Sequence, residues 1–255
     1  MSIFHDTLVQ PLFNLLIWLY TILPGADIGF AIIALTIVVK LVLWPLTHKS
    51  LTSQKALRKI QPQIKELQTK HKGNKEVLAK EMMALYAAEK VNPASSCLPL
   101  LIQLPILFAL YRVLSACLTD ANLMDLYSFV SNPEHINVIF IGLIDLSKRS
   151  IPLAIIAAAL QYWQTSMLQD TRPPKELREE EGAKDEDMMA SMNKSMKYVM
   201  PVVTLVIGIS LPGGLTLYWV AVNAISIFQQ WIAFRKTDDD TETPKTPEEP
   251  KAITA

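Results

Sequence analysis

The sequence predicts an all-α membrane protein with five transmembrane helices, a cytoplasmic αα-hairpin and an N-terminal interfacial helix. Of its 255 residues, 51% are hydrophobic, and the mean hydropathy is +0.26. Values this apolar are typical of a chain that crosses a membrane several times and argue against an ordinary soluble domain. The formal net charge is zero, but the charges are strongly segregated along the chain.

The N-terminal segment, residues 1–26, contains no Lys or Arg. The positively charged start of a cleavable signal peptide is therefore missing, and we expect none. Residues 4–23 are apolar but include Pro11, Asn14 and Trp18. We interpret this segment as an extracytoplasmic amphipathic helix that lies in the membrane interface, with a first transmembrane span as the alternative.

Five nearly uncharged stretches have the length of a transmembrane helix. They are residues 27–46, 95–117, 151–169, 195–211 and 215–234. The last two come from one long apolar run that Pro-Gly-Gly at 212–214 divides, which predicts two helices joined by a tight turn.

The basic residues orient these spans. Residues 47–96 carry ten Lys and Arg against four acids, whereas the loop 118–150 has only Lys148 and Arg149. The positive-inside rule therefore places the 47–94 loop in the cytoplasm. With five spans, the N-terminus and 118–150 are then outside, and the loop 170–194 and the tail 235–255 are cytoplasmic.

The 47–94 loop has helical periodicity of its own. Two groups of apolar residues recur at helical spacing: Leu57, Ile60, Ile64 and Leu67, and then Val77, Met82, Leu85 and Tyr86. With a turn at Gly73-Asn74, they predict an αα-hairpin with a basic outer surface. This hairpin is either a solvated linker or a docking surface for ribosomal RNA, lipid headgroups or a targeting factor.

Polar residues recur inside the apolar spans. Thr36, Lys40 and Trp44 share one helix face because they follow at four-residue spacing. The last span has a similar stripe, and two other spans contribute amides: Thr216, Trp219, Asn223, Ser226 and Gln230, with Gln103, Gln161 and Gln164. Each amide alone is compatible with a simple interhelical hydrogen bond. Because no span holds a carboxylate that could pair with Lys40, the set together predicts a hydrated cavity with one positive charge.

No catalytic chemistry is apparent in the sequence, so we predict that the protein is not an enzyme and that it uses no cofactor or metal. Nucleotide-binding loops, metal clusters and nucleophile–base pairs are missing, and the four histidines are expected at surface positions: His5, His48, His71 and His135. Cys97 and Cys117 lie in or near apolar segments, which predicts buried free thiols.

Several long motifs resemble the YidC family of membrane protein insertases, the bacterial relatives of the Oxa and Albino insertases. The most specific are EMMALYAAEKVNP at 81–93 and CLPLLIQLPILFALYRVL at 97–114. GFAIIALTIVVKLVLWPL and the hairpin that follows, at 29–64, resemble the family's first core span, and PGGLTLYWVAVNAISIFQQ at 212–230 resembles its last.

The resemblance implies a membrane protein insertase and chaperone of the bacterial plasma (inner) membrane. Its five-span bundle would hold a hydrophilic groove, open to the cytoplasm and to lipid, that works alone or with the Sec translocon. Lys40 matches a positive residue that is usually arginine, and Gln103, Gln164 and Trp219 match other motif positions. The implied substrate groove comprises Thr36, Lys40, Gln103, Gln161, Gln164, Trp219 and Asn223. The implied partners are nascent membrane proteins, the ribosome, the Sec translocon and lipids, with no specific DNA binding.

Three features depart from the family pattern. Lysine in place of arginine keeps the charge but loses the planar fork that binds a carboxylate with two hydrogen bonds. We also expect neither the large extracytoplasmic domain of many members nor the lipoprotein cysteine of others. The 235–255 tail has four basic and six acidic residues, which predicts a disordered, solvated end instead of a basic ribosome-binding extension.

Two other classes of function are compatible with some of these residues. A small-solute transporter or channel would explain an intramembrane charge, but no internal repeat and no acid partner for Lys40 accompany it. In a purely structural assembly factor, the polar residues would serve only to hold helices together.

Overall fold

The structure is a computed structural model that describes most of the chain. The described residues are 3–71, 74–92, 98–118, 126–133, 135–168 and 186–235. They are mostly helical, which confirms the all-α part of the predicted fold class. The elements in chain order are η1 (His5–Val9), α1 (Gln10–Ile22), α2 (Ile28–Val42), α3 (Trp44–Lys59), α4 (Gln61–Lys70), α5 (Lys75–Ala88), α6 (Leu98–Leu118), β1 (Ile139–Phe140), β2 (Ile144–Asp145), α7 (Ile151–Leu168), α8 (Glu186–Ser210) and α9 (Gly213–Arg235).

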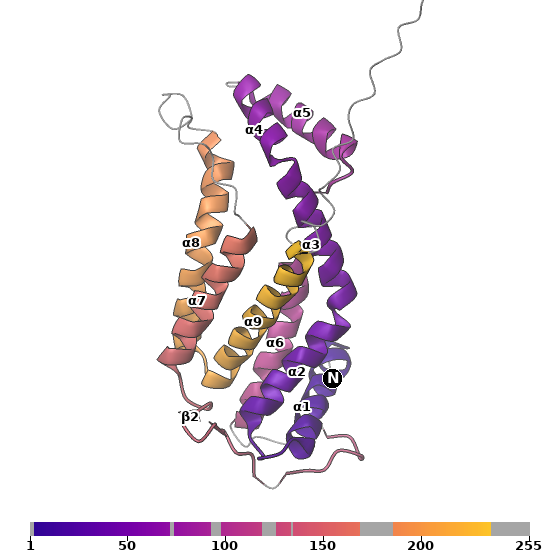
Figure 1. The fold of residues 1–255 in the computed structure, drawn as a ribbon. Coiled ribbons are helices and arrows are strands. Elements are labelled where there is room, and N and C mark those ends of the chain that lie inside the picture. Colours follow the sequence, from indigo (N-terminus) through magenta and orange to yellow (C-terminus); the bar gives the residue numbers. More distant parts are fainter. Residues whose placement is uncertain are drawn as a thin grey trace, which may run out of the picture.

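Helix α9 runs between two groups of helices (Figure 1). It packs against α2 and α6 on one side and against α7 and α8 on the other. Helix α1 covers α2 and α6, and α7 and α8 form a long antiparallel pair. Because α9 contacts all four of these helices, its side chains are the ones that can meet residues from both groups.

Helices α2 and α3 are separated by a sharp bend. Asp27 caps the start of α2 by accepting a hydrogen bond from the Gly29 amide at 2.7 Å. The chain bends by 67° between Ile28–Val42 and Trp44–Leu57. Pro45 lies in the first turn of α3, where its missing N–H costs little but prevents α2 from continuing with a full set of hydrogen bonds.

A helix that crosses a membrane must be long enough and apolar enough to do so, and the described helices can be tested for both properties. No single helix there meets both requirements, whereas Ile28–Val42 and Trp44–Leu57 meet them when taken together. The number of spans therefore stays a prediction.

The main core lies among α1, α2, α6 and α9. Among its fully buried side chains are Leu16, Ile17, Ile32, Leu110 and Tyr218. Helix α1 contributes an entire face to this core, so its apolar side packs on protein, while Trp18 and Ile22 are exposed. Its position in a membrane interface stays a prediction.

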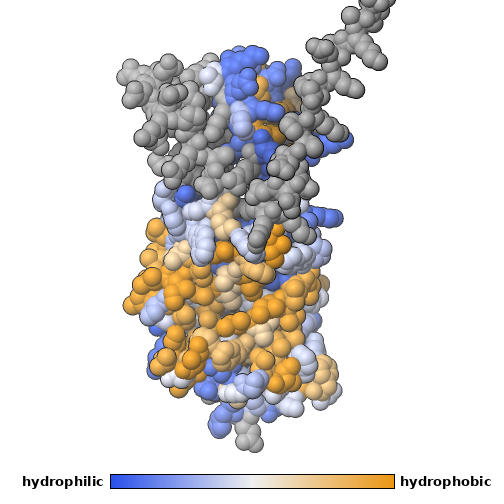
Figure 2. Space-filling view, viewed as in Figure 1, coloured by the Kyte–Doolittle hydropathy of each residue, from blue (hydrophilic) through white to orange (hydrophobic). Residues whose placement is uncertain are grey.

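Large apolar side chains also cover much of the outer surface. Figure 2 shows a broad hydrophobic belt on this face, with hydrophilic residues toward both ends. Large apolar side chains that are exposed on α6, α7 and α8 include Leu101, Phe108, Ile155, Trp163, Val202 and Val206. Water-soluble monomers rarely expose so much contiguous apolar surface, so the belt favours a lipid environment.

At one end of the bundle, backbone hydrogen bonds join three loops into what we call the loop cap. It comprises residues 23–29, 136–148 and 211–214. The Ile141 amide donates to Asp27 Oδ2 at 2.9 Å, and the Gly213 amide donates to the Lys148 carbonyl at 2.7 Å. A Cβ at Gly213 would lie 3.0 Å from that carbonyl oxygen, so this close approach favours glycine. The cap thus ties the starts of α2 and α9 together.

An ion pair supports the last turn of the loop cap. Lys148 Nζ donates to Asp145 Oδ2 at 2.8 Å, and the Ser147 amide donates to Asp145 Oδ1 at 3.0 Å. The hydrogen bonds from Lys148 and Ser147 lower the pKa of the Asp145 carboxyl to about 2. The carboxylate is therefore ionised throughout the neutral and mildly acidic range.

The helix pair α4–α5 lies at the opposite end of the molecule from the loop cap (Figure 1). It has a small core of its own around Ile60, Met82, Tyr86 and Val91. Asn74 caps α5 by accepting a hydrogen bond from the Val77 amide at 3.2 Å. Gly73, where the turn was predicted, lies outside the described residues, and a cytoplasmic hairpin stays a prediction.

Candidate functional site

The predicted intramembrane cation meets a neutral partner on the central helix. Lys40 on α2 is partly buried, and its Nζ donates a hydrogen bond to Ser226 Oγ on α9 at 2.8 Å. Among the described residues, no Asp or Glu lies within salt-bridge distance of Lys40. An ammonium has three donors, so this site presents a positive charge that a single hydroxyl only partly satisfies.

Other polar residues of α9 connect it to the second group of helices. Asn223 Nδ2 donates to the Ala157 carbonyl of α7 at 3.1 Å, and Thr216 Oγ1 donates to the Gly208 carbonyl of α8 at 3.1 Å. Both side chains are buried. Bonds of this kind between membrane helices contribute about 0.6–2 kcal/mol each.

Gln103 joins α6 to the same central helix. Its Nε2 donates to the hydroxyl of Tyr218, a fully buried residue of α9. Lys40 thus reaches α9 from α2, and Gln103 reaches it from α6. Asn223 belongs to α9 itself and reaches outward to α7. Residues of the polar stripe on α9 thus contact α2, α7 and α8, whereas α6 contacts α9 through Tyr218, which lies outside the stripe.

The remaining predicted residues stand apart from these contacts. Thr36 is buried, but its hydroxyl donates to the Ile32 carbonyl of its own helix at 2.7 Å. Gln161 and Gln164 on α7 and Trp219 on α9 are partly exposed. Their role in a substrate groove stays a prediction.

Sequence analysis did not place four buried polar atoms in the site. Four side-chain atoms are buried without a hydrogen-bond partner among the residues that the structure describes: Gln229 Nε2 and Gln230 Oε1 on α9, Ser166 Oγ on α7 and Gln54 Oε1 on α3. An unsatisfied buried polar atom costs about 1–3 kcal/mol, and such atoms are normally paired with water. They favour hydration of the protein interior toward the α3 end of α9. Gln230 belongs to the polar stripe that its four-residue spacing from Ser226 predicted, but it was not among the implied groove residues.

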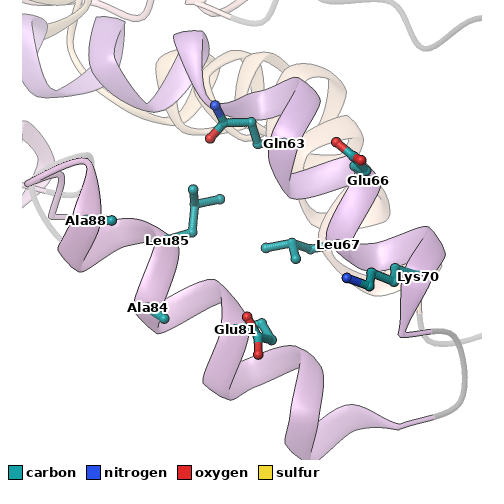
Figure 3. A pocket seen from close by; sticks show the side chains of 8 residues that line it. All are labelled: Gln63, Glu66, Leu67, Lys70, Glu81, Ala84, Leu85 and Ala88. Carbon is teal, nitrogen blue, oxygen red and sulfur yellow. The ribbon is translucent and has the colours of Figure 1, made fainter. Parts of the chain in front are cut away.

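A separate cavity of about 410 Å³ lies between α4 and α5 (Figure 3). Leu67 of α4 and Leu85 of α5 project into it, with Lys70 and Glu81 at its rim. It does not include any residue of the Lys40 site.

The residues that the structure describes hold no group of three or more His, Cys, Asp or Glu that could bind a metal ion. Cys117 is a buried free thiol, as predicted. Cys97 lies outside the described residues.

An apolar belt, a bundle organised around one central helix and a partly buried cation beside neutral polar groups together favour a helical membrane protein. A sequence model of the family described as 60Kd inner membrane protein matches residues 18–240, and the chain belongs to that family.

Three relatives of this chain share the name Membrane protein insertase YidC. The relative from Maridesulfovibrio salexigens is 33% identical over 235 residues, 90% of this chain and 38% of the relative. That from Nitratidesulfovibrio vulgaris is 38% identical over 210 residues, 82% of this chain and 35% of the relative. That from Fusobacterium nucleatum is 32% identical over 210 residues, 82% of this chain and 87% of the relative. The chain thus spans well under half the length of the first two relatives but most of the third.

Proposed function

We propose that this protein is a membrane protein insertase and chaperone that inserts and helps fold integral membrane proteins. Its family and the name shared by its relatives support this function. The observation in the structure that carries it is Lys40, a cation on α2 that faces a hydroxyl of α9 and has no acidic partner among the described residues.

The physical task of an insertase is to lower the cost of moving a polar segment through hydrocarbon. Each unpaired polar group in an apolar medium costs several kcal/mol. Neutral polar groups such as Gln164, Asn223 and Gln230, with water around them, would replace part of the hydration that the segment loses. The apolar span of the substrate would meanwhile pass into lipid beside the exposed apolar surface of the bundle.

Lys40 gives this groove a preferred charge. In surroundings of reduced dielectric, its attraction for an acidic residue of the substrate is stronger than in bulk water. The ammonium binds as a point charge without the planar fork of arginine, so it would hold an acidic segment weakly enough to release it. No bond is made or broken in this process.

The groove would open to the cytoplasm and to lipid and be closed on the outside. The hydrogen bonds of the loop cap support closure at the end where the segment 118–150 is expected to be extracytoplasmic. We further propose an outer N-terminus, a cytoplasmic C-terminus, and cooperation with the ribosome and the Sec translocon in the bacterial inner membrane.

Reconstitution tests this proposal against the transporter alternative. The purified full chain in liposomes should insert a single-span protein with a short polar N-terminal tail, measured as protease protection of that tail, above the level of empty liposomes. The same vesicles should not release an entrapped small dye faster than empty ones. Dye release without protection of the tail would instead favour a solute pathway.

A further inference from the structure

The β1–β2 hairpin of the loop cap holds an isoleucine in a strained backbone conformation. Its turn contains Ile141 and Gly142, with φ of 54° and 69°, and the Leu143 amide donates to the Phe140 carbonyl at 3.1 Å. A β-branched residue with positive φ is a genuine outlier. Hairpin turns with positive φ at both central residues prefer asparagine, aspartate or glycine at the first of them. The local backbone therefore does not favour isoleucine at this position.

Packing inside the protein does not account for Ile141 either. Its side chain is 59% exposed, and that of Ile139 on the same hairpin is 46% exposed. The hairpin buries Phe140 between them, whose ring fills the space where a Cβ at Gly29 would lie. Strained residues cluster where function requires them. Ile141 is thus an apolar group that the hairpin presents to its surroundings.

Hydrogen bonds hold the hairpin level with the start of α2. The Ile141 amide donates to Asp27 Oδ2 at 2.9 Å, and Asp27 is also the residue that caps α2. The Ile28 amide donates to the Asn137 carbonyl at 3.1 Å. The polar layer on each side of the ~30 Å hydrocarbon core of a bilayer is only about 5–8 Å thick. A turn bonded to the first residue of an apolar helix would therefore lie within that layer and not in bulk water.

Exposed apolar surface on α2 leads directly to the hairpin. Phe30 and Ile37 are 46% and 44% exposed, and their spacing of seven places them on one face of α2. The rings of Phe30 and Phe140 meet edge to face, with centroids 5.4 Å apart. Ile139 and Ile141 flank Phe140 in the chain. Because the exposed apolar surface of the bundle favours lipid, lipid is also the partner that fits its continuation on the hairpin.

The charges beside the hairpin suit a membrane surface. Residues 136–149 contain one acid and two bases. The acid, Asp145, is paired with Lys148 at 2.8 Å, and Arg149 is exposed next to this ion pair. Basic side chains near a membrane are attracted to anionic headgroups. The hairpin thus combines an apolar turn with a net positive base, at the end of the bundle where α2, α7 and α9 begin (Figure 1).

We propose that Ile139 and Ile141 insert into the lipid leaflet at the loop-cap end, at the boundary between headgroups and acyl chains. Burial in lipid removes their apolar surface from water, and Arg149 lies among the lipid phosphates. Leu143, which is 85% exposed, lies in the hydrated headgroup layer, where a water-soluble thiol reagent still reaches it. This membrane anchor fixes the depth of the closed end of the bundle. It goes beyond the insertase proposal and does not depend on it.

Fluorescence quenching in the full chain tests the lipid contact. In a background with Cys97→Ser and Cys117→Ala, a bimane dye is attached at Ile139→Cys in vesicles of phosphatidylethanolamine and phosphatidylglycerol. The water reference is Glu76→Cys at the start of α5, and the lipid reference is Ile155→Cys, an exposed position on α7. A lipid with a nitroxide near the top of its acyl chain should quench the dye at 139 at least twofold more than the dye at 76.

The two references give the experiment a clear negative outcome. Iodide on both sides of the membrane should quench the dye at 76 more than the dyes at 139 and 155. A dye at 139 that matches position 76 with both quenchers would overturn the proposal. Absence of nitroxide quenching at 155 would show that the belt itself is not in lipid, and the anchor would fall with it.

Substitutions at Ile141 separate lipid contact from folding. Ile141→Asn places a residue that tolerates positive φ in the turn, so the melting temperature in detergent should stay the same or rise. Nitroxide quenching of the dye at 139 should nevertheless fall at least twofold, because the anchor loses an apolar side chain. The matched control Ile141→Met keeps the apolar character and should keep the quenching. A lower melting temperature with unchanged quenching for Ile141→Asn would mean that the isoleucine serves packing instead.

Nanodiscs of the same lipids that hold a single copy of the chain test the choice of partner. Nitroxide quenching of the dye at 139 should persist there, because the anchor needs only lipid. Loss of quenching in single-copy nanodiscs would show that a second copy of the chain creates the apolar environment, and it would overturn lipid as the occupant.

Discussion

At the scale of single residues, Lys40 carries the clearest functional assignment. On the insertion scale a lysine at the centre of a membrane helix costs about 2.5–3.5 kcal/mol, and Lys40 lies in the last turn of α2, close to the bend that precedes α3. Its hydrogen-bond partner there is Ser226, a neutral group that leaves the positive charge uncompensated. We interpret the remaining charge as the feature that attracts acidic residues of a substrate and keeps the site hydrated.

Charge substitutions at position 40 test this interpretation. Lys40→Arg should retain most insertion activity, whereas Lys40→Ala should lower insertion of substrates with acidic translocated tails about tenfold or more, and Lys40→Glu should lower it further. Ser226→Ala is the matched control, since it removes the partner and keeps the charge, and it should have a small effect. Protease protection of acidic and neutral tails provides the measurement.

Other outcomes at position 40 would identify other roles. Full rescue by Lys40→Gln together with a tolerated Lys40→Glu would show that hydration alone matters. Full activity of Lys40→Leu on every substrate would show that the lysine merely extends to the membrane interface.

Neutral polar residues should be individually dispensable because hydration is shared among many groups. Asn223→Ala removes one hydrogen bond to Ala157, worth about 1 kcal/mol, and Gln164→Ala removes one partly exposed amide. Each variant should keep substantial insertion activity, and the double variant should lose more than either. Complete loss in one single variant would contradict a generally hydrated groove and indicate a specific contact.

At the scale of elements, the sequence predicts helices better than the contacts between them. Helices α7 and α9 nearly coincide with the ranges 151–169 and 215–234, because charges and the Pro-Gly-Gly turn mark their ends. The first apolar stretch, 27–46, is interrupted at Leu43. Hydropathy did not predict this break, because it does not register the effect of Pro45 on the turn before it. The β1–β2 pair was also missed, since two-residue strands have no periodicity to detect.

The Lys40 site shows the same limit. Four-residue spacing places Lys40 and Ser226 each on a polar face, but they are 186 positions apart in sequence. Which faces meet depends on the register between α2 and α9, and that register is set by the packing of the whole bundle.

The α4–α5 pair should be needed for activity but not for membrane integration. Its core is separate from that of the bundle, so deletion of residues 52–88 with a short linker should leave the bundle intact. Carbonate extraction should show an embedded protein, and the insertion assay should show impaired activity. Unimpaired insertion would reduce the pair to a spacer.

At the scale of the whole molecule, the two ends differ in character. The loop cap closes one end with backbone hydrogen bonds, and the basic α4–α5 pair occupies the other. The positive-inside rule assigns the basic end to the cytoplasm. This polarity would let a substrate enter from the basic end and prevent leakage at the cap.

Labelling of sealed cells with a membrane-impermeant thiol reagent tests this orientation. In a background without native cysteines, Leu143→Cys in the loop cap should react from outside, and Gly73→Cys should react only after the cells are opened. External labelling at position 73 would reverse the topology.

The central claim is that the polar residues around α9 are the path for the polar segment of an incoming membrane protein. The most direct measurement is photocrosslinking to a stalled, single-span nascent chain, with the photoreactive residue placed at Gln164 or Trp219. Trp18 is the control, because it is 44% exposed and lies on α1, which packs against α2 and α6 instead of against the polar stripe of α9. The account predicts crosslinks from Gln164 and Trp219 to the polar tail of the nascent chain and few from Trp18. Equal crosslinking from Trp18, or none from the two groove positions in an active protein, would contradict it.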